Sequence, residues 1–114
     1  MSATRVLFVC SRNRLRSPTA EAVAAGWPGV EAVSAGTAPD AEARVSADLV
    51  AWADVVVCFE ARHRHHFQRA FGPLLRDTRL VVLEVPDEYA LMDRDLVDVL
   101  DRRLPGLLGV EPPR

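Results

Sequence analysis

Hydrophobic residues occur along the chain in two alternating patterns, short unbroken runs and longer stretches with helical spacing. Residues 6–9 form an unbroken apolar run, which is typical of a strand buried on both faces of a sheet. Leu96, Val97 and Leu100 instead form an apolar stripe along one side of a helix. Applied to the whole chain, the pattern predicts strands at 5–9, 29–34, 54–59 and 79–85 and helices at 18–27, 40–52, 62–71 and 93–104.

Strands and helices alternate in this prediction, and that order defines the expected fold class. Such alternation typically forms a parallel sheet with helices on both faces, and ligands bind at the carboxyl ends of its strands. We therefore expect an α/β protein, a single-domain three-layer α/β/α structure over residues 1–114 with a four-stranded parallel sheet. A turn is expected at 35–39, and the proline-rich end at 111–114 is expected to fray.

Composition and charge narrow the class of protein. Apolar residues make up 49% of the chain and charged residues 26%, as in ordinary globular proteins. The net charge of −2 argues against a general nucleic-acid partner, because such domains carry a basic excess. The 2 cysteines lie far apart, and no secretory or membrane-spanning stretch is visible. These features predict a cytoplasmic protein with free thiols and no membrane partner.

The segment after the first expected strand has an unusual polar sequence. It reads Cys-Ser-Arg-Asn-Arg-Leu-Arg-Ser-Pro from Cys10 to Pro18. Ser17 followed by Pro18 is typical of a helix N-cap and the first helical residue. Loop amides and a helix N-terminus together bind anions, and the planar guanidinium of Arg16 matches two phosphate oxygens. The segment therefore predicts a phosphate-binding loop directly after the first strand.

The two cysteines lie in contrasting surroundings. Cys58 lies within the apolar run 55–59 and is expected to be a small buried hydrophobic residue. Cys10 opens a loop rich in arginine, and cationic surroundings favour the thiolate, which is the nucleophilic form of the side chain. We therefore expect Cys10, and not Cys58, to be the nucleophile.

The order of these segments resembles the low-molecular-weight protein tyrosine phosphatase family. That family has a strand, then Cys-x-x-Asn-x-x-Arg-Ser-Pro, then a helix. The matching residues of this chain are Cys10, Asn13, Arg16, Ser17 and Pro18. Three later segments resemble the family's Ser-Ala-Gly-Thr segment, its third strand and its acid-bearing segment, and they are residues 33–37, 52–60 and 86–89.

The resemblance implies a hydrolase of phosphate monoesters that works through a phosphocysteine on Cys10. It implies that Arg16 binds the phosphate, that Ser17 stabilises the thiolate and that Asp87 is the general acid and then the general base. The implied substrate is phosphotyrosine in a phosphorylated protein, or a small phosphate ester. Phosphate, vanadate and sulfate are the expected oxyanion ligands, and no metal or other cofactor is expected.

Several of the candidate residues have an alternative role. Asn13 is a simple turn residue, or a left-handed residue that braces the loop against Ser34, as the resemblance implies. Asp93 is the rival of Asp87, although an N-cap of the last helix suits it better. Tyr89 is a rim aromatic or half-buried filler. The phosphate-binding residues are expected to be Ser11, Arg12, Asn13, Arg14, Leu15, Arg16 and Ser17, with the side chains of Arg12 and Arg14 directed to solvent.

The chain also departs from the family pattern, and this keeps other functions open. Leu15 stands where many members have a second loop cysteine, and Glu88 replaces the proline after the acid. The run His63-Arg64-His65-His66 invites a metal interpretation, but a solvated helix face suits the interleaved arginines better. The remaining alternatives are an arsenate reductase that uses an external thiol and a non-catalytic module that binds phosphate or a phosphopeptide.

Overall fold

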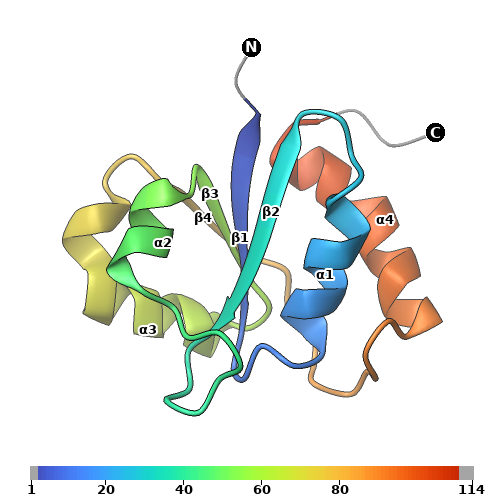
Figure 1. Cartoon of the computed structure of the whole chain (residues 1–114), viewed down its shortest axis with the longest axis horizontal. Helices are drawn as coiled ribbons and strands as arrows, with labels where there is room; N and C mark the ends of the chain where they lie inside the picture. The colour runs from blue at the N-terminus through green and yellow to red at the C-terminus, as the bar shows by residue number, and fades with distance from the viewer. Residues whose placement is uncertain (1–2, 111–114) are drawn as a thin grey trace.

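The structure, a computed structural model that describes residues 3–110, is built around a four-stranded parallel sheet. The strands lie in the order β2-β1-β3-β4, and every neighbouring pair is parallel (Figure 1). Their bounds are Thr4–Cys10 for β1, Val30–Gly36 for β2, Val55–Cys58 for β3 and Arg79–Val82 for β4. The expected α/β fold with a parallel sheet and helices on both faces is confirmed.

Strand β1 lies between β2 and β3, and its side chains enter the core on both faces of the sheet. Val6 and Phe8 belong to one buried cluster, whereas Leu7 and Val9 belong to the other. All four side chains are fully buried. Side chains of successive strand residues point to opposite faces, so an unbroken apolar run is what a two-faced sheet requires.

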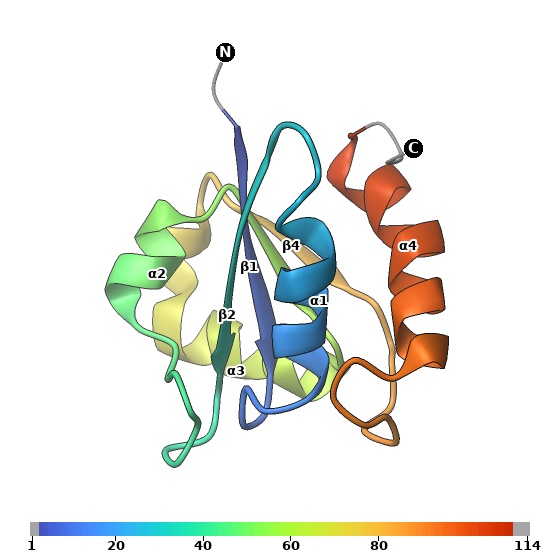
Figure 2. The same ribbon diagram turned by 45° about the vertical axis from the view of Figure 1, so that its right-hand side comes forward.

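The helices cover the two faces in pairs. Helices α1 (Arg16–Ala24) and α4 (Arg94–Leu108) lie against one face, where Ala20, Leu96 and Leu100 join the first cluster. Helices α2 (Ala47–Trp52) and α3 (Ala61–Phe71) lie on the other face, followed by a short 3-10 helix, Gly72–Leu75. Figures 1 and 2 show the sheet between these two pairs.

The region after β2 differs from the sequence-based expectation. The strand continues through Gly36, so the expected turn at 35–39 begins two residues late. The expected helix at 40–52 is helical only over Ala47–Trp52, because the Ser46 hydroxyl accepts from the Leu49 amide and caps the helix there. The residues before it form a loop in which Arg44 bridges to Gly36. This loop packs beside Cys10 and the residues that follow it.

The remaining bounds differ mainly at the ends of elements. The last helix runs to Leu108, four residues past its expected end, and Asp93 is its N-cap, with a side chain that accepts from the Asp95 amide. The expected frayed end at 111–114 lies outside the described residues. Within residues 3–110, no helix is both long and apolar enough to cross a membrane.

Candidate active site

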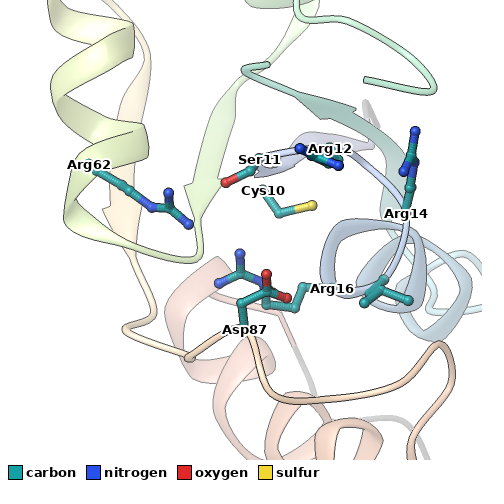
Figure 3. A pocket seen from close by; sticks show the side chains of 8 residues that line it. Cys10, Ser11, Arg12, Arg14, Arg16, Arg62 and Asp87 are labelled. Atoms are coloured by element: carbon teal, nitrogen blue, oxygen red, sulfur yellow. The ribbon is translucent and has the colours of Figure 1, made fainter. Parts of the chain in front are cut away.

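A cavity of about 480 Å³ opens at the carboxyl end of β1. It collects side chains from the loop after β1, from α3 and from the segment after β4. Figure 3 shows them around the sulfur of Cys10, with Arg62 reaching from α3 and Asp87 from the later segment. The lining residues are Cys10, Ser11, Arg12, Arg14, Leu15, Arg16, Arg62 and Asp87.

The loop after β1 is held by its carbonyl oxygens. The carbonyls of Cys10, Ser11 and Arg12 accept hydrogen bonds of 3.0, 2.8 and 3.0 Å from amides in segment 37–42. In a trans peptide the N–H points opposite to the C=O, so the following amides face away from that segment. The loop between β2 and α2 therefore turns the peptide groups of the Cys10 loop.

The amides of the Cys10 loop have no protein partner in the described part of the chain. From Ser11 to Ser17, none of the backbone N–H groups donates to another group within residues 3–110. The last of them open helix α1, whose first-turn amides are unpaired as in any helix and carry the positive end of its dipole. Consecutive unpaired amides before a helix N-terminus form an anion-binding site.

Gly36 lets the two loops approach each other closely. A Cβ atom at this position would lie 2.6 Å from the Ser11 carbonyl oxygen and 2.7 Å from the Ala41 Cβ. Both distances are shorter than real Cβ contacts, and the first atom is backbone that cannot move aside cheaply. Glycine is therefore required at the end of β2 for the Cys10 loop to keep its path.

Ser17 contacts the Cys10 thiol instead of capping the helix. The Ser17 Oγ lies 3.0 Å from the Cys10 Sγ and donates a 2.8 Å hydrogen bond to the Asn13 Oδ1. Helix α1 already begins at Arg16, and its N-cap Leu15 forms no side-chain cap. The N-cap role predicted for Ser17 is therefore wrong, and its hydroxyl is directed at the thiol.

Asn13 adopts the left-handed conformation implied by the resemblance, with φ of 55°. Its side chain braces the loop internally by accepting from Ser17. The predicted contact with Ser34 is wrong, because the Ser34 hydroxyl donates a 2.6 Å hydrogen bond to Glu21 on α1. Ser34 therefore ties β2 to α1 and does not support the loop through Asn13.

The Arg16 side chain is buried and held from two sides. Its Nη1 donates to the Glu60 Oε2 and to the Val85 carbonyl oxygen, each at 2.8 Å. The guanidinium also lies 5.9 Å from the centre of the Phe59 ring. Since it is only 2% exposed, the side chain is fixed at the cavity before any ligand arrives.

Glu60 keeps a negative charge between two arginines. Burial alone would raise the pKa of this carboxyl, but hydrogen bonds from Arg62 and Arg16 outweigh it and lower the pKa to about 2. Arg62 donates to the same Oε2 atom at 2.8 Å. Glu60 is therefore ionised at neutral pH, and it places both guanidinium groups beside the cavity.

His63 also supports the loop, which corrects the expectation that it lies on a solvated helix face. It lies on the buried side of α3 with 1% exposure, so the expected solvated face does not include it. Its Nδ1 accepts from the Glu60 amide at 3.1 Å, and its Nε2 lies 3.0 Å from the Ser11 Oγ. Burial, followed by the charge of Arg16, lowers the pKa of His63 to about 4. The ring is therefore neutral at pH 7, and Nε2–H donates to Ser11.

The two candidate acids occupy different environments. Asp87 is 55% exposed and lies at the cavity, with its Oδ1 3.7 Å from the Arg16 Nε. Asp93 is occupied at the start of α4, where it caps the helix. The geometry therefore brings Asp87, and not Asp93, to the Cys10 loop.

The remaining candidates lie at the rim or in the core. The side chains of Arg12 and Arg14 are 59% and 48% exposed and pair with Asp40 and Glu42 at 3.9 and 3.3 Å. They are directed to solvent as expected, although they also line the cavity mouth. Tyr89 is partly buried against the cluster between the sheet, α1 and α4, so the filler role fits it.

Cys58 is fully buried in β3, and burial raises the pKa of its thiol to about 12. It is therefore a protonated core residue, as the sequence predicted. The residues that the sequence did not assign to the site are Glu60, Arg62 and His63. Glu60 directly follows the third strand, at the edge where ligands bind in such sheets, and this position was the available signal.

Solved structures with the same fold cover nearly the whole chain. The YwlE arginine phosphatase from Geobacillus stearothermophilus has a TM-score of 0.72 and 21% identity, and the alignment covers 93% of this chain and 94% of that one. The tyrosine phosphatase Wzb from Escherichia coli K30, solved with phosphate, has a TM-score of 0.73 and 17% identity over 94% and 97% of the two chains. The chain therefore has the fold of the low-molecular-weight phosphatases, and the resemblance is confirmed at that level.

The same fold also includes an arsenate reductase. The thioredoxin-dependent arsenate reductase from Corynebacterium glutamicum has a TM-score of 0.66 and 20% identity, covering 95% of this chain and 61% of its own. No protein-family model and no curated protein matches the sequence. The fold is therefore shared by tyrosine phosphatases, arginine phosphatases and arsenate reductases.

Proposed function

We propose that this protein hydrolyses phosphate monoesters through a phosphocysteine on Cys10. The observation that carries the proposal is the run of amides from Ser11 to Ser17, which follows Cys10 directly and has no partner within residues 3–110. An anion held by these amides lies directly in front of the thiol and beside Arg16. A phosphate group suits both side chains, because the thiolate can attack its phosphorus atom while the fixed guanidinium holds its oxygens.

In the first step the Cys10 thiolate attacks phosphorus in line with the leaving oxygen. The S–P bond forms as the P–O bond breaks, while the loop amides and Arg16 stabilise the charge on the equatorial oxygens. Asp87, in its protonated form, gives its proton to the leaving oxygen. Its exposed position at the cavity suits a group that exchanges protons with solvent and substrate.

In the second step water releases the phosphate. The Asp87 carboxylate takes a proton from the water, whose oxygen bonds to phosphorus as the S–P bond breaks. The sulfur leaves as a thiolate, and the Ser17 hydroxyl 3.0 Å away is positioned to donate to it. Ser17 therefore assists the same atom as attacker and as leaving group.

Among the substrates of this fold, we propose phosphotyrosine over phosphoarginine. Leu15, 37% exposed, gives the cavity one apolar wall for an aromatic ring. Arg12, Arg14 and Arg62 also line it, and their charges oppose a leaving group that carries a guanidinium. A direct comparison of phosphotyrosine and phosphoarginine peptides tests this choice, and faster turnover of phosphoarginine would reverse it.

Arsenate reduction is the second candidate, because one structure of this fold has that activity. Electron transfer through protein thiols requires a second reactive cysteine, and Cys58 is buried in a strand with its pKa raised to about 12. An arsenate reductase activity of this chain therefore needs an external thiol. Arsenate-dependent oxidation of such a thiol, without phosphatase activity, would favour this candidate.

Turnover of p-nitrophenyl phosphate by the wild type and two variants tests the proposal. Cys10→Ser removes turnover but keeps phosphate binding, because the backbone amides and Arg16 remain. Asp87→Asn lowers kcat by about 10²- to 10⁴-fold for leaving groups of high pKa, and less for those that leave without a proton. Asp93→Asn is the matched control and affects stability only. Phosphate binding without turnover by the wild type would instead support a non-catalytic binding module.

A further inference from the structure

The exposed side of α3 next to the cavity carries a row of basic side chains. Arg62, His65 and Arg69 follow each other at helical spacing, so they lie on one side of α3, and all three are exposed. Together with Gln68 they line a second hollow of about 440 Å³. We call these four residues the basic face.

The basic face has little negative charge of its own to neutralise it. Helix α3 contains no aspartate or glutamate, although the whole chain has a net charge of −2. Within residues 3–110, Arg62 pairs with Glu60, and Arg69 has no carboxylate within ion-pair distance. A cationic surface on an acidic protein therefore remains available to an external anion.

Helix stability explains only part of this arrangement. Arg69 lies in the last turn of α3, where a cation interacts favourably with the helix dipole. Arg62 lies in the first turn, where the dipole disfavours a positive charge. Arg62 is held there by Glu60 and directed at the cavity, so its position is explained by the site and not by the helix.

Arg62 joins the basic face to the cavity, because it lines both hollows. The rise of an α-helix places Arg69 about 10 Å farther along α3 than Arg62. An extended peptide covers that distance in about three residues. A peptide whose phosphate occupies the Cys10 loop can therefore place neighbouring side chains on the basic face.

We propose that the basic face binds an acidic segment of the phosphorylated substrate protein, about three residues from the phosphorylated side chain. The inference rests on the proposed phosphatase function, and it adds a substrate preference that the cavity itself does not supply. Carboxylates of the segment pair with Arg69 and with the outer side of Arg62, while the phosphate is held by the loop. Such pairs act mainly on substrate binding, so KM changes and kcat does not.

The test compares two phosphotyrosine peptides of equal length. One carries glutamates three to five places from the phosphotyrosine on both sides, and the other carries serines there. We expect the wild type to show a KM about tenfold lower for the acidic peptide, with equal kcat, and this preference fades as salt is raised. Equal KM values together with normal turnover of p-nitrophenyl phosphate overturn the inference but leave the proposed function standing.

Two variants with the same change of charge locate the effect. Arg69→Glu removes the preference for the acidic peptide while its kinetics with p-nitrophenyl phosphate stay at the wild-type level. Arg103→Glu on α4, also exposed, keeps the preference. If both variants lose the preference for the acidic peptide equally, the effect is one of net charge in general, and the inference is overturned.

Binding measurements keep the test independent of turnover. Cys10→Ser, titrated with the fluorescent acidic and serine phosphopeptides, gives their Kd values even if the chain is a non-catalytic module. The same protein titrated with phosphatidylserine vesicles and with single-stranded DNA measures other anionic partners. Tighter binding of the acidic peptide, sensitive to Arg69→Glu, supports the proposal, and equally Arg69-dependent binding of vesicles or DNA overturns it.

Discussion

The Ser17 hydroxyl has one proton and three polar neighbours, which are the Cys10 Sγ, the Asn13 Oδ1 and, at a longer 3.4 Å, the Ala35 carbonyl oxygen. It donates that proton to the Asn13 Oδ1, so the 3.0 Å contact with Cys10 is made by the thiol proton. When Cys10 ionises, the hydroxyl must turn to the sulfur, and Asn13 then loses its donor. The brace of the loop and the stabilisation of the thiolate therefore compete for one proton.

Ser17→Ala tests how much this hydroxyl favours the thiolate. Without the donor, alkylation of Cys10 by iodoacetamide requires a higher pH, because a hydrogen bond to the ionised form is lost. Phosphocysteine breakdown slows more than its formation, because the sulfur is then the leaving group. Ser46→Ala, which removes the side-chain cap of α2 and no hydrogen bond to Cys10, is the control. An unchanged alkylation profile in Ser17→Ala would show that the amides and Arg16 suffice.

At the scale of elements, one buried hydroxyl links two segments that carry residues of the proposed mechanism. The Thr19 Oγ1 donates a 2.6 Å hydrogen bond to the Leu15 carbonyl oxygen in the Cys10 loop. The same atom accepts a 3.0 Å hydrogen bond from the Met92 amide, at the end of the segment that contains Asp87. Thr19 itself is fully buried. The first turn of α1 therefore fixes the acid-bearing segment relative to the loop.

Thr19→Val keeps the shape of the side chain and removes both hydrogen bonds. We expect a stability loss of about 1–3 kcal/mol, because the Met92 amide loses its acceptor, whereas the Leu15 carbonyl still accepts from the Thr19 amide. We also expect kcat to fall about tenfold for leaving groups of high pKa, because Asp87 is less well placed to give its proton. Thr19→Ser, which keeps the hydroxyl, should keep the wild-type kcat. A stability loss with an unchanged dependence on the leaving group would limit Thr19 to a structural role.

The close approach of β2 to the Cys10 loop gives a second prediction at this scale. Gly36→Ala forces the Ser11 carbonyl away, which turns the amides that face the cavity. Loss of one well-placed donor costs about 10²- to 10³-fold in kcat, so a similar loss is expected here. Gly26→Ala, with no atom within 4 Å of its new methyl group, is the matched control and keeps full activity.

For the whole molecule, the sequence predicts the sheet and the loop better than the contacts around them. Unbroken apolar runs identify strands such as β1 because burial on both faces leaves no polar position. The partner of Asn13 could not be predicted, since Ser17 and Ser34 offer the same chemistry and only the fold places one of them within reach. The burial of His63 was not predicted, because the charged residues around it hide that it turns inward together with Phe67.

The burial of His63 also gives the whole molecule a pH dependence. Its pKa is about 4 in the folded protein and 6.5 when solvated, so between these values the unfolded chain binds the proton and the folded protein does not. Stability is therefore full above pH 6.5 and falls as the pH is lowered toward 4, by on the order of 3 kcal/mol in total. Glu60 adds a further loss only below about pH 4.5.

Urea unfolding between pH 7 and pH 5 isolates the contribution of His63. The wild type loses stability over this interval, and His63→Gln loses less because no proton is taken up at that position. His65→Gln, on the exposed side of α3, follows the wild type. If the free energy of unfolding falls equally with pH in the wild type and in His63→Gln, the buried ring is not the group that titrates.

The two cysteines belong to clusters on opposite faces of the sheet, Cys10 with α1 and α4 and Cys58 with α2 and α3. Peroxide converts a reactive thiol to a sulfenic acid, which a neighbouring thiol normally captures as a disulfide before further oxidation. Here the sheet separates the only two sulfur atoms that could pair. After treatment with peroxide, the intact mass should show added oxygen atoms and no internal disulfide. When glutathione is present before peroxide is added, one glutathione should be bound to Cys10 as a mixed disulfide. Protection against oxidative stress then depends on the thiol pool around the protein.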